Sequence, residues 1–179
     1  MIDTPEKAYW AGYASLAGHV DEDVLTVVSK ERFHLDSLLS ILPDGDLSMF
    51  EVETGHRKNA AYYTFTHEPG DVLEWHRPVR KLASHSIRGM LDARPVFCWD
   101  LNSIDVDLPT EHAEFVMEFM PYLRIEHLTE YKTRLYTCTT YDTKRALEYL
   151  YRYAPVARPS RKALYDGLEK ERKEAQAVQ

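Results

Sequence analysis

The sequence predicts an α+β protein built from two pseudo-symmetric halves, each with the element order helix-strand-strand-helix-strand-strand-helix (αββαββα). Three observations lead to this prediction. Two helix-to-strand junctions recur about 77 residues apart, at residues 10–18 and 87–95. Short strand-like runs are separated by hairpin-sized turns, which favours antiparallel sheets. Helical segments between these runs are expected to pack on one side of each sheet.

The first half opens with a helix-start signal, in which Thr4 is a capping residue and Pro5 occupies the first helical position. This helix is expected to continue to about Ala17 and to stop at Gly18. An acidic turn at 21–23 separates it from a strand at 24–28. The remaining elements expected in this half are a helix at 32–42, hairpin strands at 47–53 and 60–66, and a short closing helix at 71–76.

The second half is expected to follow the same order. Its elements are a helix at 79–93, strands at 96–99 and 103–108, a helix starting at Pro109, strands at 124–131 and 134–140, and a final helix at 143–153. Residues 1–78 and 79–155 are therefore interpreted as two repeats. Residues 156–179 are interpreted as a basic C-terminal extension that Pro159 interrupts. It lies over the body, binds nucleic acid or forms a solvated helix, and the solvated helix is the favoured interpretation.

Charge is distributed unevenly along the 179 residues. Residues 1–143 hold 13 Lys/Arg and 24 Asp/Glu, whereas residues 144–179 hold 9 and 5, so the net charges are −11 and +4. A duplex-binding surface normally carries an excess of Lys and Arg, because neutralised phosphates supply most of the affinity. The body of the chain therefore argues against an extended duplex interface, and the tail permits one.

Other features narrow the class of protein. Two cysteines are too few for a disulfide framework, and there is neither a long apolar run nor a signal-like N-terminus. We therefore expect a cytoplasmic protein without a membrane segment. The eight histidines show no metal-binding spacing, and common nucleotide-binding and hydrolase motifs are lacking.

The two junction segments read WAGYASLAG at residues 10–18 and IRGMLDARP at residues 87–95. Both resemble the paired helices of the LAGLIDADG homing endonucleases, and residues 146–151 are similar to the usual C-terminal segment of that family. The resemblance implies a degenerate, single-chain member with two repeats. It also implies that the two antiparallel sheets form a saddle and that the chain is a monomer.

In the family, the two motif helices pack side by side along the pseudo-twofold axis, which requires small residues at the contact. Arg88 does not suit such a contact and is expected to point outward, while the family position of Asp92 serves helix capping. The residues expected at the helix interface are Ala11, Gly12, Ser15, Gly89, Asp92 and Ala93.

Each family helix ends in an acid that holds a divalent cation beside the scissile phosphate. The corresponding positions here are Ala17 and Arg94. Alanine offers no ligand atom and a guanidinium repels a cation, so we predict no catalytic residue, no metal ligand and no cofactor. The alternative is an active Mg²⁺-dependent endonuclease that cleaves double-stranded DNA, with a metal site rebuilt from Asp92, Asp100 or the acids at 21–23.

The saddle is the DNA-binding face in the family, and here its strands and strand ends carry many acids. These acids either face the partner or lie on loops and rims, and both readings stay open because strand register is uncertain by one residue. The acids are Glu51, Glu53, Asp100, Asp105, Asp107, Glu126 and Glu130. The candidate binding-face residues are Arg57, Lys58, Tyr63, Lys132 and Arg134.

The function expected from the resemblance is that of a catalytically inactive regulator. It would bind nucleic acid, as DNA or RNA, or else a nucleic-acid-handling protein whose basic cleft accepts an acidic surface. Small free-standing members of the family are common in phages and mobile elements, so a phage-encoded inhibitor is one form of this hypothesis.

Overall fold

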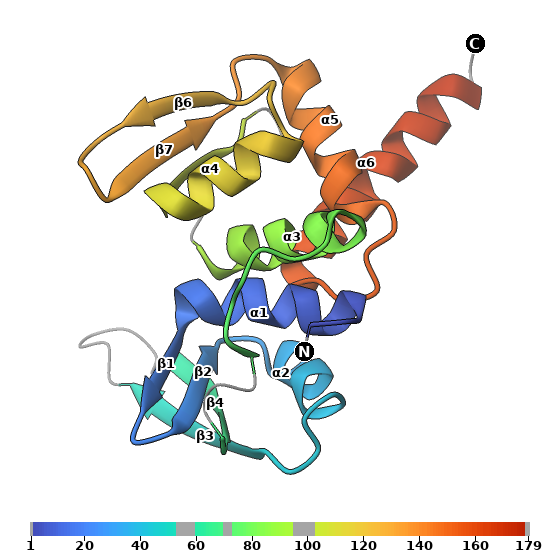
Figure 1. Ribbon diagram of the computed structural model, residues 1–179. Coiled ribbons are helices and arrows are strands. Elements are labelled where there is room, and N and C mark those ends of the chain that lie inside the picture. Colours follow the sequence, from blue (N-terminus) through green and yellow to red (C-terminus); the bar gives the residue numbers. More distant parts are fainter. Residues whose placement is uncertain (1, 53–59, 70–72, 95–102, 178–179) are drawn as a thin grey trace.

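The computed structural model of the chain describes residues 2–52, 60–69, 73–94 and 103–177. Two helices, α1 (Pro5–Ala17) and α3 (Ala83–Ala93), lie side by side at the centre, with one antiparallel sheet on each side (Figure 1). The predicted α+β class is therefore confirmed. Thr4 begins α1 as expected, since its Oγ1 accepts a hydrogen bond of 3.2 Å from the backbone N–H of Lys7.

The first half continues with β1 (Gly18–Asp21), β2 (Val24–Ser29), α2 (Arg32–Leu39), β3 (Asp46–Val52) and β4 (Ala60–His67), and its strand order is β1-β2-β4-β3. Strand β1 was not predicted. It pairs with β2 through a two-residue turn in which Glu22 and Asp23 have positive φ angles of 47° and 67°. Two positive φ angles are the pattern that matches the twist of a tight hairpin, so the acidic turn is the hairpin loop itself.

The second half contains η2 (Arg80–Leu82), α3, β5 (Asp105–Pro109), α4 (Thr110–Phe119), β6 (Arg124–His127), β7 (Lys132–Tyr136), α5 (Thr140–Tyr151) and α6 (Pro159–Ala177). Its strand order β5-β7-β6 repeats the order β2-β4-β3 of the first half. The strand predicted at 96–99 lies outside the described residues. Helix α5 begins three residues earlier than predicted, because Thr139 caps it by accepting from the N–H of Asp142.

The helix predicted at 71–76 is wrong over residues 74–76, which have no regular secondary structure, and residues 70–72 lie outside the described part. Tertiary contacts decide this segment. The indole of Trp75 stacks on the ring of His112 at 4.5 Å between centroids and donates a hydrogen bond of 3.0 Å to Oγ of Ser86. As far as the structure describes the chain, the first half therefore has no counterpart of α5.

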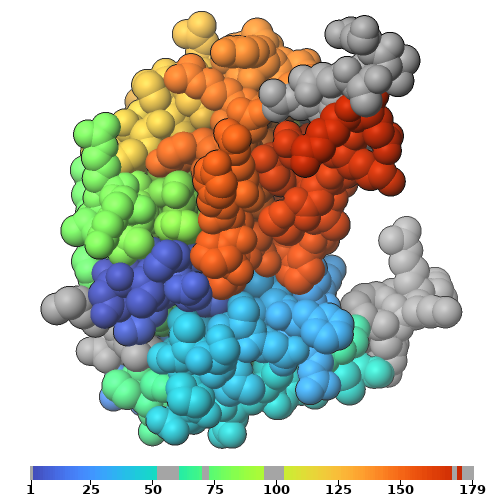
Figure 2. Space-filling view, turned by 90° about the vertical axis from the view of Figure 1, so that its right-hand side faces the viewer, coloured from blue at the N-terminus to red at the C-terminus, as the bar shows by residue number. Residues whose placement is uncertain are grey.

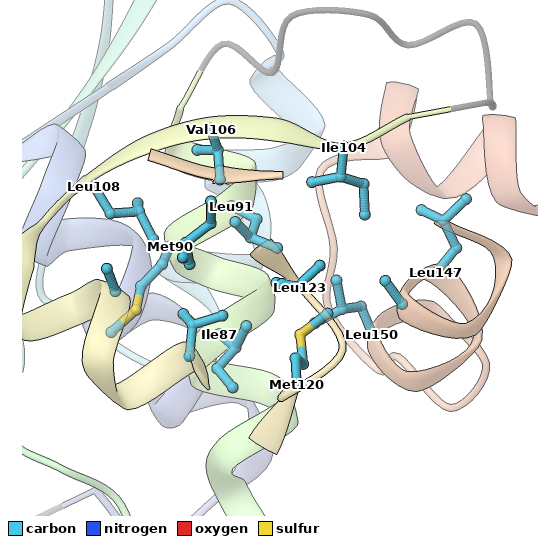
Figure 3. Close-up of a cluster of buried hydrophobic side chains, with 14 of the residues drawn as sticks. Ile87, Met90, Leu91, Ile104, Val106, Leu108, Met120, Leu123, Leu147 and Leu150 are labelled. Atoms are coloured by element: carbon cyan, nitrogen blue, oxygen red, sulfur yellow. The ribbon is translucent and has the colours of Figure 1, made fainter. Parts of the chain in front are cut away.

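Each half has its own hydrophobic core beneath its sheet. The first core includes Tyr9, Trp10, Leu35, Leu38 and Phe65. The second is formed by side chains from α3, α4, α5 and the second sheet (Figure 3), including Ile87, Met90, Leu91, Val106, Leu108, Met120, Leu147 and Leu150. The α1 and α3 helices join the two cores, since Leu16 packs against the second and Ala93 against the first.

Helix α6 begins at Pro159, so this proline occupies the first helical position and does not interrupt the C-terminal segment. Tyr165 packs on Tyr151 of α5 with ring centroids 6.1 Å apart, and the outer end of the helix leaves the body of the protein (Figure 1). Neither α6 nor any other helix of the described residues has the length and apolar character of a membrane span.

Candidate functional site at the helix pair and the sheet faces

The central helices cross in backbone contact at Gly12 and Gly89. A Cβ atom on Gly12 would lie 2.2 Å from the carbonyl oxygen of Ser86, and one on Gly89 would lie 2.0 Å from that of Tyr9. The glycines are 77 residues apart, and so are Tyr9 and Ser86. The same contact is therefore made twice about the pseudo-twofold axis, and only glycine allows this approach.

The other predicted interface residues lie at or beside this crossing. Ala11 and Asp92 are buried, while Ser15 and Ala93 are half-buried. Ser15 Oγ donates to the carbonyl of Gly12 at 2.8 Å and lies 3.1 Å from Nε2 of His112 on α4. Ser15 thus connects α1 to the second half through α4.

Arg88 does not point outward, contrary to the sequence prediction. Its side chain is buried, and its guanidinium donates to the carbonyl oxygens of Val156 at 2.7 Å and Leu150 at 2.6 Å. The guanidinium also lies over the ring of Tyr9 at 5.4 Å. Carbonyl groups at the end of α5 and just beyond it satisfy the buried cation, which a sequence pattern cannot show.

Asp92 is fully buried and connects three elements. Its carboxylate accepts hydrogen bonds from Oη of Tyr9 at 2.9 Å, Oη of Tyr151 at 2.5 Å and the backbone N–H of Arg158 at 2.8 Å. Burial raises the pKa of Asp92, and these three donors oppose the rise. The residue is therefore a structural acceptor between α1, α5 and the segment before α6, in place of the helix cap expected for it.

The network extends to His34 on α2. Oη of Tyr9 gives its single proton to Asp92, so the contact of 2.6 Å with Nε2 of His34 requires that nitrogen to be the donor. Nδ1 of His34 is buried without a hydrogen-bond partner among the described residues. Burial lowers the pKa of His34 to about 3, which keeps the imidazole neutral.

The segment between α5 and α6 fastens the second half to the first. Nε of Arg158 donates to Glu31 at 2.5 Å, and the backbone N–H and the hydroxyl of Ser160 donate to the same carboxylate at 2.9 and 2.8 Å. Burial tends to raise the pKa of Glu31, but these donors outweigh it and the pKa is lowered. Val156 is buried in the first core. Sequence reasoning missed this clamp, because its partners are more than 120 residues apart.

Ala17 and Arg94 lie where α1 and α3 end. Ala17 is the last residue of α1, and Arg94 is the C-cap of α3. The backbone carbonyl of Arg94 accepts a hydrogen bond of 3.0 Å from the guanidinium of Arg161. Nε of Arg94 is buried and has no acceptor among the described residues. The pKa of His112 is lowered by burial and, in part, by the positive charge of Arg94. The helix ends therefore present a methyl group, a guanidinium and a half-buried imidazole.

Across the described parts of the chain, no three His, Cys, Asp or Glu side chains lie together in an arrangement that could hold a metal ion. Asp21 lies at the exposed end of β1, and Asp92 is enclosed by its three donors.

The outward face of the first sheet, called here the first-sheet face, is mostly uncharged. The ring of Tyr62 stacks on Phe50 at 5.6 Å, and Nζ of Lys30 lies 5.2 Å from the centre of the Tyr62 ring. Pairing of β1, β2, β3 and β4 places the following residues on this face: His19, Asp21, Val24, Thr26, Val28, Asp46, Ser48, Phe50, Tyr62, Thr64 and Thr66.

The predicted binding-face residue Tyr63 is on the other side of the first sheet. It is partly buried against the first core, and its neighbour Tyr62 takes the outward position. Successive side chains of a strand point to opposite faces of the sheet, so an error of one residue in the predicted register moves a side chain to the other face. Arg57 and Lys58 lie outside the described residues.

The outward face of the second sheet, the second-sheet face, carries paired charges. The guanidinium of Arg134 forms an ion pair with Asp105, in which Nε donates at 2.7 Å, and a second ion pair with Glu126 at 3.4 Å. Nζ of Lys132 lies 2.7 Å from the carboxylate of Asp107. The residues of this face are Asp105, Asp107, Arg124, Glu126, Lys132, Arg134 and Tyr136. Three acids thus match three bases.

The other acids considered at the sequence level are distributed differently. Glu130 lies in the loop between β6 and β7, and Glu51 lies on the edge strand β3. Glu53 and Asp100 are outside the described residues. The acids of the second half therefore divide between the outward face and the rim.

No protein-family model and no curated protein matches the chain. Two solved structures resemble it in fold. The N-terminal LAGLIDADG domain of DUF199/WhiA shares 15% identity at a TM-score of 0.53, over 88% of this chain and 85% of that one. Full-length DUF199/WhiA from Thermatoga maritima shares 15% identity at a TM-score of 0.58, over 99% of this chain and 69% of that one. Together with the paired glycine helices, these similarities show that the chain has a LAGLIDADG-like fold.

Proposed function

We propose that this chain is a LAGLIDADG-like regulator that binds nucleic acid without cleaving it. The observation that carries the proposal is that Ala17 and Arg94 lie at the ends of α1 and α3. The alignment of the two sequence motifs equates these residues with the family's metal-binding acids. Metal-assisted hydrolysis needs hard oxygen ligands at that place. A guanidinium supplies none, but it can pair with a phosphate.

The alternative, a metal-dependent endonuclease acting on double-stranded DNA, needs carboxylates from elsewhere. Asp92 does not suit this role, because its oxygens already accept three hydrogen bonds that connect the two halves. Asp21 is exposed and lies on the first-sheet face, at the end of β1. These placements favour binding over cleavage.

Two further observations support nucleic acid as the partner. The first is the similarity in fold to the LAGLIDADG domain of WhiA. The second observation concerns the first-sheet face, where Lys30, Tyr62 and a row of threonine and serine hydroxyls offer a cation, an aromatic ring and hydrogen-bond donors. Its two acids, Asp21 and Asp46, lie at the ends of β1 and β3. Arg94 would contact a phosphate at the centre, and this face would contact the flanking nucleotides.

The test is one assay on randomised duplex DNA with Mg²⁺ or Mn²⁺, scored for both retention and cleavage. We expect retention without cleavage. Arg94→Gln should weaken retention by about tenfold, since it removes a charged phosphate contact. Arg32→Gln, an equal charge loss at an exposed position on α2, should leave it unchanged. Metal-dependent cleavage by the wild-type protein would overturn the proposal.

A nucleic-acid-handling protein is the second candidate partner, and the charge pattern favours it. The chain has a net charge of −7, and the second-sheet face presents three carboxylates beside cations that they neutralise. This candidate predicts no retention of nucleic acid. It also predicts dose-dependent inhibition of a nucleic-acid enzyme that is relieved by the triple variant Asp105→Asn, Asp107→Asn and Glu126→Gln.

A further inference from the structure

A second surface, away from both sheet faces, combines tyrosines and cations. It is formed by the exposed side of α5 together with η2 and is called here the α5 face. Tyr141, Arg145 and Tyr149 follow one another at a spacing of four residues on α5, which places them in one stripe along the helix. The members of the α5 face are Arg80, Tyr122, Tyr141, Lys144, Arg145, Tyr149, Arg152 and Tyr153.

Apart from the half-buried Tyr122, the side chains of the α5 face are exposed. Tyr141 and Tyr153 are 74% and 79% exposed, and Tyr149 is 38% exposed. The guanidinium of Arg145 lies 4.4 Å from the centre of the Tyr122 ring, and that of Arg152 lies 5.3 Å from the Tyr153 ring. Figure 2 shows α5, in orange, in the upper middle of the molecule, beside the red helix α6.

Residue Arg80 brings η2 into the same surface. Burial raises the pKa of Tyr149, and the positive charge of Arg80 partly offsets this rise, so the two side chains are neighbours. Arg80 is exposed. The stripe on α5 is thus flanked by one additional cation from a segment more than 60 residues earlier in the chain.

The cations of the α5 face differ from those of the second-sheet face. No carboxylate of the described residues forms a salt bridge with Arg80, Lys144, Arg145 or Arg152. In contrast, Lys132 and Arg134 are both paired with acids. The positive charge of the α5 face is therefore available to an anionic partner without first breaking an internal ion pair.

We propose that the α5 face binds single-stranded nucleic acid. Arginine and lysine groups would neutralise the phosphates, and exposed tyrosine rings would stack on bases. The stripe from Tyr141 to Tyr149 is about 12 Å long, at 1.5 Å per helical residue, and Tyr153 extends the surface beyond the end of α5. Exposed tyrosine rings favour a single strand as the partner, because its unpaired bases can stack on them. In a duplex the base faces are covered by neighbouring base pairs, and an acidic peptide has no bases. The inference goes beyond the proposed function, because it concerns a different surface and a different form of nucleic acid.

The experiment measures binding of the full chain to a fluorescein-labelled single-stranded dT20 by anisotropy over a range of salt concentrations. The triple variant Arg80→Gln, Arg145→Gln and Arg152→Gln should weaken binding at least about tenfold and reduce the salt slope by about 2, since three phosphate contacts are lost. The control Lys162→Gln, Lys170→Gln and Lys173→Gln removes the same charge from α6 and should bind like the wild type. Circular dichroism melts check that both variants are folded.

Tyr149→Leu separates base stacking from charge attraction. It should weaken dT20 binding by about tenfold and leave binding of poly-L-glutamate unchanged. Equal binding of dT20 by the wild type and the α5 triple variant would overturn the inference. So would an unchanged affinity of Tyr149→Leu for dT20 together with tight binding of poly-L-glutamate, because the surface would then recognise acidic chains in general.

The two proposals fail in different ways. Loss of duplex retention in Arg94→Gln with no effect of the α5 triple variant on dT20 would support the proposed function and overturn this inference. Loss of dT20 binding in the α5 triple variant, without any effect of Arg94→Gln on duplex, would support the inference and count against the proposed function.

Discussion

The two halves of this protein share a backbone plan and differ in their surfaces. The strand order β2-β4-β3 of the first sheet returns as β5-β7-β6 in the second. On the first-sheet face, Lys30, Tyr62 and Phe50 lie among hydroxyl groups, whereas acids and bases alternate on the second-sheet face. Packing constrains the inward residues in both halves, and the outward residues are free to diverge. A partner in the saddle would therefore meet two chemically different surfaces.

The central helices show the same divergence at equivalent positions. Gly12 and Gly89 make the same close contact. The positions three residues further along are different, since α1 has Ser15 there and α3 has Asp92. Ser15 reaches His112 at 3.1 Å, and Asp92 holds Tyr9, Tyr151 and the segment before α6. Symmetry is thus kept where backbones touch and is lost where side chains have room.

The glycine crossing is the strictest shared feature, so it should give the largest effect. Gly12→Ala and Gly89→Ala should each lower the free energy of unfolding by about 3 kcal/mol, because a Cβ would meet a backbone carbonyl. Gly167→Ala, which meets nothing within 4 Å on α6, should be stabilising by about 0.5–1 kcal/mol. Urea unfolding measures all three. If either crossing variant were as stable as Gly167→Ala, the helices would not be in backbone contact.

The equivalent positions Asp92 and Ser15 should respond unequally. Asp92→Asn replaces one of the two accepting oxygens by an NH2 group, so at least one buried donor loses its acceptor, and the change should cost about 3 kcal/mol. Ser15→Ala removes one half-buried hydroxyl and should cost about 1 kcal/mol. The measurement is again urea unfolding at neutral pH. Equal losses would mean that the three hydrogen bonds to Asp92 contribute no more to stability than the contacts of Ser15.

The buried His34 of the first half predicts a pH dependence of stability that a single substitution isolates. The folded pKa of His34 is about 3, below its unfolded value of about 6.5, so its contribution to stability is complete above pH 6.5 and is lost as pH falls. Between pH 6.5 and 5 the loss should be about 2 kcal/mol. His34→Gln keeps a donor toward Tyr9 and should abolish that slope.

The difference between wild type and His34→Gln isolates this histidine from the nearby acids. Asp92 has a raised pKa, so its contribution has the opposite sign and is lost as pH rises through the folded value. The pKa of Glu31 is lowered, so its contribution is lost only at more acidic pH. Identical stability profiles for the two proteins from pH 7 to 5 would contradict a neutral, buried His34.

The smallest expected effect is on the second-sheet face. Lys132→Gln combined with Arg134→Gln breaks exposed ion pairs, which contribute little to stability in water. The melting temperature should change by no more than about 2 °C, in low and high salt alike. A larger fall would show that these charges hold the sheet together, and the contrast between the two sheet faces would then be structural as well as chemical.

Several features of the fold follow from local sequence. Thr4 and Pro5 start α1, Gly12 and Gly89 mark the helix crossing, and the small residues around them fit a LAGLIDADG-like pair. These features are readable because capping and close backbone approach depend on the residues themselves. The positions of Ala17 and Arg94 at the helix ends follow from the same alignment of the two motifs.

Only the tertiary structure decided the rest. The direction of Arg88, the partners of Asp92 and the clamp between Glu31 and Arg158 join residues far apart in the chain. The outward position of Tyr62 in place of Tyr63 depended on strand register. A sequence determines local propensity and spacing, but which distant carbonyl meets a buried guanidinium, and which face a strand presents, are settled when the elements pack.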